Sequence, residues 1–345
     1  MNKKCISIIM ILGLFLISNV AFSAPRPFFE GKTIRVIVGL SAGGGYDIWA
    51  RMIARHYGKN IPGNPTVIVE NMTGAGSLIA ANHIYKAARP DGLTIGHISG
   101  WVLMNQLFAD KPGIEFDARK YEYIGAPYQD EMVVFITKAS GITTMEKWFN
   151  SKFPVKFGGQ APGATFSDNT PRVLAAALGL PVKSVEGYKG TAEIKLACES
   201  GEVHGNCLSW ESGKVTWRKD LETGNVIPIL QVVPKPIPEI PHVPLAISYA
   251  KTDEARELLD MGVHKPPVFA RPFMLPPGTP KDRVEMLRKA FEATLKDKEF
   301  LAELEKAKMT LNPVTGEELK NVIDGLFKID PAKIAKLNEI VFRKN

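Results

Sequence analysis

Three glycine-rich loops are the parts of this sequence whose residue types and spacing suit anion chemistry. They cover residues 41–47, 73–77 and 163–167, and each lies between a predicted strand and a predicted helix. Glycine lets a ligand approach the backbone closely, and the unpaired N–H groups of a helix N-terminus attract negative charge. Such loops predict an anion-binding cleft where parallel strands end. A purely structural turn is the alternative for each loop taken alone.

Motifs for nucleotide or hydrolytic chemistry are missing from these loops. The GxGxxG fingerprint requires a third glycine, but Ile48 and Ile79 take its place, and no Walker A lysine is present. Ser99 and Ser209 end predicted strands, yet neither has a base nearby and the GxSxG elbow is absent. We therefore expect no cofactor and no enzymatic activity, with an exported hydrolase that uses a distant triad as the enzyme alternative.

The histidines and cysteines show no spacing typical of a metal site, so we expect no bound metal. Cys198 and Cys207 flank a predicted turn at Gly201, and an oxidising compartment would permit a disulfide between them. Two buried free thiols are the alternative, and the sequence leaves both open.

The N-terminus has the three regions of a secretory signal peptide. Lys3 and Lys4 precede an apolar run over residues 6–20, and residues 21–23 read Ala-Phe-Ser, so we predict that residues 1–23 are a signal peptide cleaved after Ser23. The apolar run is shorter than the roughly 20 residues needed to span a bilayer, which disfavours a membrane anchor. The mature chain is therefore predicted to be exported to the periplasm.

Composition and periodicity predict an α/β protein. The 345 residues are 45% hydrophobic and 23% charged, as in an ordinary globular protein. The net charge is +7, but the sequence lacks the dense basic stripe of a nucleic-acid-binding protein. Strands predicted at residues 33–39, 66–69 and 93–98 alternate with helices, which indicates a parallel sheet. A second α/β unit begins near residue 125, with a helix predicted to open at Thr170-Pro171, and a proline-rich connector follows at residues 234–244.

The ordered motifs resemble the solute receptors of tripartite tricarboxylate transporters, also called the Bordetella uptake gene family. The resemblance rests on residues 32–39 running into 42–47, then on residues 69–76, 88–94, 188–193, 201–203 and 275–280. It implies a two-lobed type II periplasmic binding protein fold with a hinged interlobe cleft that closes like a Venus flytrap. The implied lobes are residues 24–125 plus 240–345 (lobe I) and residues 126–239 (lobe II).

The resemblance further implies a periplasmic solute-binding receptor, expected to be a monomer, that captures a small organic carboxylate for membrane permease subunits. A sensory receptor that passes its ligand to a signalling partner is the alternative. One carboxylate of the ligand would be held by main-chain N–H groups, small hydroxyls and ordered waters of the first-lobe loops, and the second lobe would close over the other end. The residues expected to bind it are Ser41, Ala42, Gly44, Gly45, Tyr46, Gly74, Ala75, Gly76, Ser99, Gly100, Ala164, Thr165, Phe166 and Ser209.

Three departures from the family pattern bear on the ligand. Tyr46 replaces a small hydroxyl residue, and Phe166 lies in a loop that lacks the usual histidine. The strand that commonly ends in an aspartate near the cleft ends here in Ser209. An ammonium group would need that acid, so the departures disfavour an amino acid as ligand.

Overall fold

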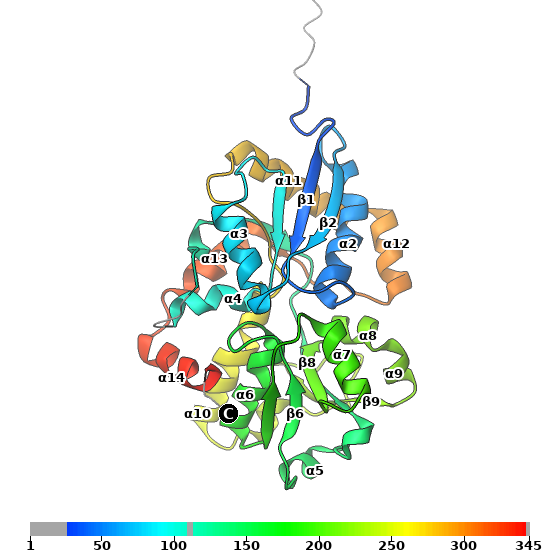
Figure 1. Ribbon diagram of the computed structural model, residues 1–345, viewed down its shortest axis with the longest axis vertical. Helices are drawn as coiled ribbons and strands as arrows, with labels where there is room; N and C mark the ends of the chain where they lie inside the picture. Colours follow the sequence, from blue (N-terminus) through cyan, green and yellow to red (C-terminus); the bar gives the residue numbers. More distant parts are fainter. Residues whose placement is uncertain (1–25, 109–112, 343–345) are drawn as a thin grey trace, which may run out of the picture.

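A computed structural model describes residues 26–108 and 113–342 of the chain, and the predicted signal peptide lies outside these residues. The elements form two α/β lobes, one above the other, each built on its own sheet (Figure 1). No helix within the described ranges is both long and apolar enough to cross a membrane.

The first lobe contains a six-stranded mixed sheet in the order β11-β4-β10-β3-β1-β2. Strands β1, β2 and β3 are parallel, as the sequence predicts, whereas β10 and β11 join antiparallel because they return from distant parts of the chain. The strands are β1 (Thr33–Val38), β2 (Thr66–Asn71), β3 (Thr94–His97), β4 (Glu122–Ala126), β10 (Phe273–Leu275) and β11 (Val314–Thr315).

Helices cover both faces of the first sheet. One face buries a cluster that includes Trp49, Tyr57 and Phe291 under α2, α11 and α12, and the other face packs against α3 and α4. The helices of this lobe are α2 (Gly45–Tyr57), α3 (Leu78–Lys86), α4 (Trp101–Met104), α11 (Lys281–Leu295), α12 (Lys298–Ala307) and α13 (Gly316–Leu326).

The second lobe contains a five-stranded mixed sheet in the order β7-β6-β8-β5-β9. Its β5 is antiparallel to β8 and β9, while β6 is parallel to β7 and β8. The strands are β5 (Met132–Thr137), β6 (Val155–Gly158), β7 (Val182–Val185), β8 (Gly205–Ser209) and β9 (Val226–Val232). The helices are α5 (Met145–Phe149), α6 (Phe166–Leu178), α7 (Thr191–Glu199), α8 (Trp210–Thr216), α9 (Arg218–Glu222), α10 (Asp253–Leu259) and α14 (Pro331–Val341).

Helix α6 begins at Phe166, four residues before the predicted opening at Thr170-Pro171. Thr165 and Asp168 form a capping box, in which each side chain bonds the backbone N–H of the other residue. This box starts the helix earlier and leaves Pro171 inside its second turn, where the helix still forms.

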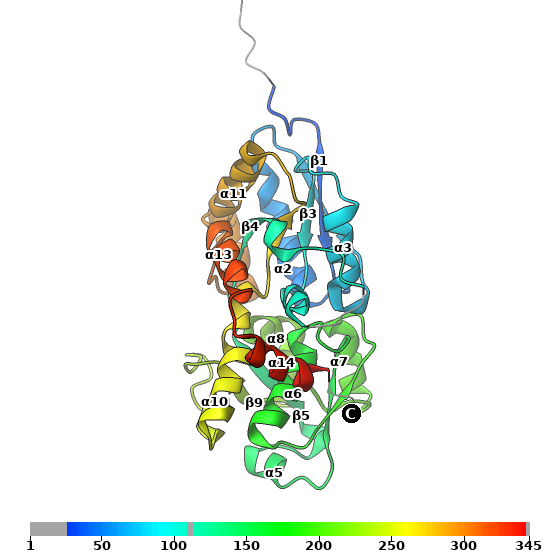
Figure 2. The same ribbon diagram turned by 90° about the vertical axis from the view of Figure 1, so that its left-hand side faces the viewer.

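The proline-rich segment does not lead directly back to the first lobe. The buried Gln231 amide donates to Ile240 O and Val243 O and accepts from Ile237 N, which fixes the segment against the second lobe. Helix α10 then packs on α6, and α14 also packs on α6 after the chain has passed through the first lobe (Figure 2).

The predicted assignment of residues 240–345 to lobe I therefore differs from these contacts, because buried side chains hold residues 240–264 and α14 to the second lobe. From the contacts we propose three crossings between the lobes, near residues 127–131, 265–272 and 327–330.

The two cysteines, for which the sequence left a disulfide open, are both free and buried. Cys207 points from β8 into the cluster under α6, whereas Cys198 of α7 lies in the cluster on the opposite face of the sheet. Because successive residues of a strand point to opposite faces, the sheet itself separates the two thiols.

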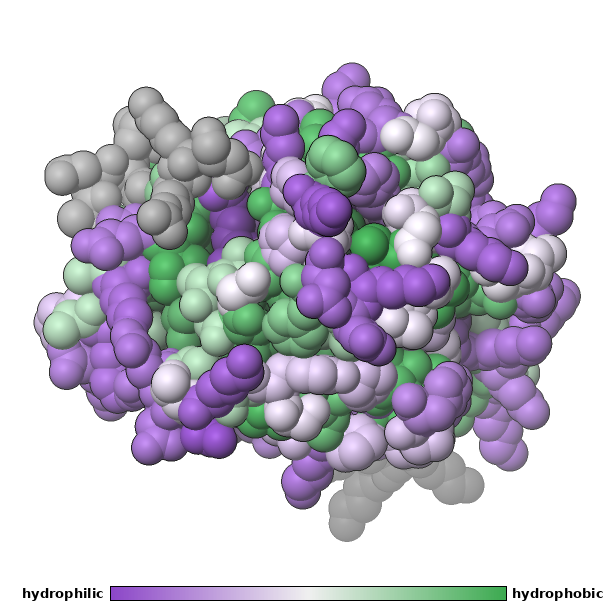
Figure 3. Space-filling view, turned by 90° about the horizontal axis from the view of Figure 1, so that it is seen from below, coloured by the Kyte–Doolittle hydropathy of each residue, from purple (hydrophilic) through white to green (hydrophobic). Residues whose placement is uncertain are grey.

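The outer face of the second lobe, seen from below in Figure 3, mixes hydrophobic residues with more hydrophilic ones. Phe153, just after α5, is 77% exposed and is the most exposed large hydrophobic side chain of the described residues. An isolated exposed apolar residue is common on soluble proteins, so we assign this face no role.

Candidate functional site

A small cavity lies between the two lobes. Its volume is about 30 Å³, enough for roughly two water molecules or a group of similar size. Both lobes and the crossing before β10 contribute to its wall. The lining residues are Leu40, Gly45, Tyr46, Asp130, Met132, Gln160, Thr165, Phe166, Ser167, Thr191, Cys207, Leu208, Ser209, Ser212 and Arg271.

Arg271 carries the only positive charge among these lining residues, and it is 2% exposed. Its Nε donates to Asp130 Oδ1 at 2.5 Å, and its Nη2 donates to Ser209 Oγ at 2.8 Å and Ser212 Oγ at 2.6 Å. Nη1 is buried and has no hydrogen-bond partner within the described part of the chain. One nitrogen of this buried guanidinium therefore lacks an acceptor.

Asp130 and Arg271 form a buried ion pair, so their charges cancel in the cavity wall. Burial raises the pKa of Asp130, against the lowering effect of the guanidinium. Burial alone would lower the pKa of Arg271, but the Asp130 charge raises it, so the guanidinium stays protonated. An anion at Nη1 would thus meet a permanent cation that already has one counter-ion.

Tyr46 and His97 form an aromatic wall behind the guanidinium. The Arg271 guanidinium lies 4.7 Å from the Tyr46 ring centroid, and the Tyr46 hydroxyl donates to Ala270 O at 2.9 Å. The His97 ring lies 5.2 Å from the Tyr46 ring, and burial lowers the pKa of His97 to about 3. His97 is therefore neutral and adds no second cation beside Arg271.

The first-lobe turn is closed by its own aspartate. Asp47 accepts from Gly43 N at 2.9 Å, from Arg51 Nε at 2.9 Å and from Asn71 Nδ2 at 3.0 Å. Burial would raise the pKa of Asp47, but these donors, with Arg51 the largest contribution, bring the pKa below its ordinary value. The turn therefore already holds a carboxylate, which belongs to the chain itself.

The second-lobe loop is closed in the same way by Asp168, which is fully buried. Asp168 accepts from the backbone N–H groups of Gln160 (2.5 Å), Ala161 (3.1 Å) and Thr165 (2.8 Å), and from the Thr165 hydroxyl at 2.7 Å. Burial raises the pKa of Asp168 to about 7, against these hydrogen bonds, which lower it. Thr165 N, which belongs to a residue predicted to bind the ligand, is thus engaged within the chain.

Direct contacts hold the two lobes together around the cavity. Ser99 Oγ donates to Ala164 O at 2.9 Å, and Ser41 N donates to Lys189 O at 3.0 Å. A Cβ added at Gly45 would overlap the Ser212 hydroxyl across the lobes. The structure therefore shows the lobes in a closed arrangement.

The structure brings five of the predicted ligand-binding residues into the cavity wall. These are Gly45, Tyr46, Thr165, Phe166 and Ser209. The remaining predicted residues do not line it, although Ser41, Ser99 and Ala164 take part in the interlobe contacts. Those outside the wall are Ser41, Ala42, Gly44, Gly74, Ala75, Gly76, Ser99, Gly100 and Ala164.

Sequence reasoning missed Arg271, Asp130 and Ser212. Arg271 is the lone charged residue in the otherwise apolar run of residues 266–275. A single arginine in such a run is a signal for a buried, paired charge, since arginine is almost never fully buried without a partner. Asp130 and Ser212 carry no comparable signal, because only the fold brings them to Arg271.

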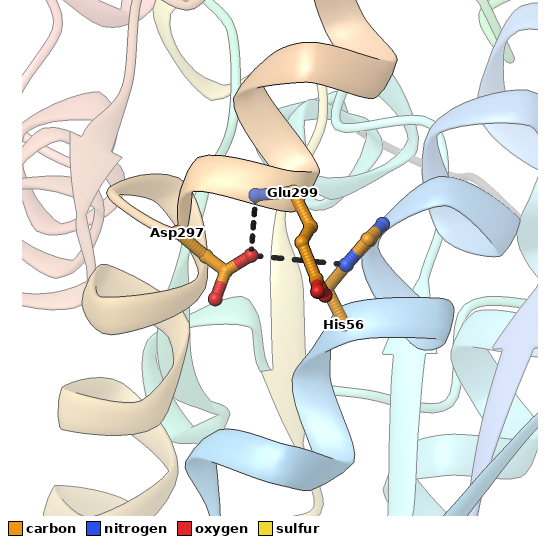
Figure 4. A group of neighbouring side chains, drawn as sticks. All are labelled: His56, Asp297 and Glu299. Carbon is orange, nitrogen blue, oxygen red and sulfur yellow. Dashed lines mark hydrogen bonds and ion pairs between the residues drawn. The ribbon is translucent and has the colours of Figure 1, made fainter.

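One cluster outside the cavity has the residue types of a metal site, namely His56, Asp297 and Glu299 (Figure 4). Lys59 Nζ already lies between its acids, 2.9 Å from Asp297 and 2.6 Å from Glu299, and His56 is bonded to Glu303 at 2.7 Å. The ammonium group takes the position that a cation would need, so this cluster is an ion-pair network on the surface of the first lobe.

Comparison with protein families gives a match over most of the chain. Residues 50–338 match the model described as the tripartite tricarboxylate transporter family receptor. A Cupriavidus necator relative, described as UPF0065 protein in gbd 5'region, is 32% identical over 181 residues. That match covers 51% of this chain and 53% of the relative, so the chain spans about half the length of the curated relative it matches.

Solved structures share the fold at low sequence identity. The periplasmic binding protein BugD has a TM-score of 0.71 at 20% identity, covering 90% of this chain and 97% of that chain. MatC from Rhodopseudomonas palustris, with bound malate, has a TM-score of 0.68 at 20% identity, covering 91% and 100%. A second R. palustris protein, with adipate, has a TM-score of 0.71 at 20% identity, covering 89% and 97%.

Proposed function

This chain belongs to the tripartite tricarboxylate transporter receptor family, and we propose from that premise that it captures a small organic carboxylate between its two lobes. The observation that carries the proposal is the Arg271 guanidinium, buried in the interlobe cavity with Nη1 unpartnered among the described residues. A charge-assisted hydrogen bond to a carboxylate is about twice as strong as a neutral one, and it would satisfy this nitrogen.

Ligand entry requires the lobes to separate. The closed cavity of about 30 Å³ is smaller than any acid of more than a few heavy atoms. We therefore propose that the crossings act as a hinge, and that a ligand stabilises a closed form with a larger cavity to the extent that it binds that form better than the open one. The solved relatives with malate and adipate support a carboxylate as the class of ligand.

We also propose that the protein works in the periplasm, delivers its ligand to membrane permease subunits and does not transform it. The family description and the periplasmic relative support this location and role. Binding without turnover of the ligand, followed by mass spectrometry, is the expected result, and a changed product would contradict a pure receptor.

A thermal-shift screen of mono-, di- and tricarboxylates tests the proposal. A ligand at 100 times its dissociation constant should add about 2.7 kcal/mol to the free energy of unfolding. The variant Asp130→Asn/Arg271→Gln removes both buried charges together, so neither is left unpaired, and we expect ligand affinity to fall at least 100-fold.

The matched control is Arg35→Gln/Glu70→Gln, which removes an exposed ion pair and should leave affinity unchanged. If no acid shifts the melting temperature, the proposed carboxylate capture fails. If the Asp130/Arg271 variant binds as tightly as the wild type, the proposed role of Arg271 in binding fails.

A further inference from the structure

The charges that line the interlobe cavity define the kind of acid it can hold. Of the described lining residues, Arg271 and Asp130 are the two that carry charge, and they are paired with each other. We propose that this site selects acids with a single carboxylate and an apolar remainder, and discriminates against dicarboxylates. The inference rests on the proposed carboxylate-binding function and specifies its substrate class.

Arg271 can offer a ligand only part of its guanidinium. Nε is bound to Asp130, and Nη2 is bound to the hydroxyls of Ser209 and Ser212. Nη1 alone is left without a partner in the described chain, and it lies beside Gly45, where an added Cβ would come within 3.5 Å of it. The geometry therefore provides one charge-assisted contact to one carboxylate.

A second carboxylate of a ligand would find no further cation among the described residues that line the cavity. His97, which lies behind Tyr46, is uncharged because burial lowers its pKa to about 3. Lys214, the cation on α8, is engaged by Glu211 and Glu239. Burying a charge without a partner is costly, so a dicarboxylate would have to leave one of its charges unpaired or remain partly hydrated.

The neighbouring acid increases this penalty. Asp130 already balances the arginine, so the wall has no excess positive charge. With one cation and one anion in the wall, a monoanionic ligand leaves the site at a net charge of −1, and a dianion leaves it at −2. Binding therefore becomes electrostatically less favourable with each negative charge added to the ligand.

The rest of the wall suits an apolar ligand body. Leu40, Met132, Phe166 and Leu208 come from both lobes and contribute hydrocarbon surface. An amino acid is disfavoured, because Asp130, the acid in the wall, is already paired with Arg271. These surfaces match an alkyl or aryl group attached to one carboxylate.

Isothermal titration calorimetry on the mature chain, residues 24–345, tests the proposal with acids of matched length. Butyrate is compared with succinate, and hexanoate with adipate. We expect the monoacid of each pair to bind at least tenfold more tightly. Succinate or adipate binding as tightly as its monoacid would overturn the selectivity, and so would an amino acid that binds more tightly than butyrate.

A charge variant gives a gain-of-function test of the same idea. Asp130→Asn removes the counter-ion of Arg271 and gives the site a net positive charge, so succinate affinity should rise at least tenfold relative to butyrate. Asp253→Asn, a fully exposed acid on α10, changes the net charge equally and should leave the ratio unchanged. An unchanged ratio in a folded Asp130→Asn variant would contradict the proposal.

The outcomes separate the two proposals. Binding of dicarboxylates with no preference for monoacids removes the selectivity but keeps the carboxylate receptor. If none of the acids binds, the receptor function itself fails. The wild-type comparison decides the selectivity even where Asp130→Asn does not fold.

Discussion

Asp47 in the first lobe and Asp168 in the second do the same structural task in different electrostatic surroundings. Each closes a cleft-facing loop by accepting backbone N–H groups at the start of a helix. Asp47 is paired with Arg51, and its pKa is lowered, whereas Asp168 accepts from uncharged backbone N–H groups and the Thr165 hydroxyl, and burial raises its pKa to about 7.

The comparison shows why glycine-rich loops alone do not locate the anion site. In both lobes a carboxylate from the same chain accepts from a backbone N–H of the glycine-rich loop, that of Gly43 in the first lobe and that of Thr165 in the second. We propose that anion recognition depends on Arg271, which lies at a crossing between the lobes and belongs to neither loop.

The largest expected effect comes from removing the second-lobe carboxylate. Asp168→Ala would leave three buried backbone N–H groups without an acceptor, at about 1–3 kcal/mol for each unsatisfied group. We expect the free energy of unfolding to fall by about 3 kcal/mol or more, measured by urea denaturation. Asp47→Ala, which frees one backbone N–H and a half-exposed arginine, should cost about 1–2 kcal/mol. Equal losses in the free energy of unfolding for Asp168→Ala and Asp47→Ala would contradict the expected difference between the two loops.

The interlobe approach of the first loop gives the next largest effect. Gly45→Ala places a methyl group on the Ser212 hydroxyl and should hold the lobes apart, weakening ligand affinity at least tenfold in calorimetry. Gly44→Ala is the matched control, because its Cβ would lie 3.6 Å from the nearest atom, an ordinary contact. If the two neighbours behave alike, closure does not depend on this contact.

The pH dependence of stability should have opposite signs at the two aspartates. Asp168 has a folded pKa of about 7, above its unfolded value near 4, so its contribution is greatest below about pH 4 and is lost as the pH rises to about 7. Asp47 has a lowered folded pKa, so its contribution is present above pH 4 and is lost as the pH falls through that pKa.

Urea denaturation across pH 3–8 checks these signs against Asp168→Asn and Asp47→Asn. The wild type should lose stability relative to Asp168→Asn between about pH 4 and 7, and relative to Asp47→Asn only in more acidic solution. A flat difference for Asp168→Asn over that range would show that burial does not raise this pKa.

The smallest effect is expected at the hydrogen bond that joins the lobes at the second loop. Ser99→Ala removes the donor to Ala164 O, and a single net hydrogen bond contributes about 0.5–1.5 kcal/mol. Ligand affinity should therefore fall by about two- to tenfold, because the bond forms only in the closed arrangement. Ser248→Ala, whose hydroxyl bonds within its own turn on the second lobe, is the control that should not change affinity.

Much of the fold could be predicted from the sequence. The β-branched runs and glycine turns predicted the parallel strands β1–β3 and the second α/β unit, since local periodicity reports strand and helix directly. The family motifs predicted the two-lobed fold, which the family match and the solved relatives confirm. The path of the chain after β9 was harder to predict, because Gln231 and α14 are held to the second lobe by contacts that no local sequence pattern encodes.

The sequence by itself determined the class of this protein, its two lobes and the loops that face the cleft, because these follow from local residue types and their order. Tertiary structure alone decided that Asp130, Ser209, Ser212 and Arg271 meet in one cavity. These residues are separated by up to 141 positions, and the energy of a buried charge depends on which distant groups surround it.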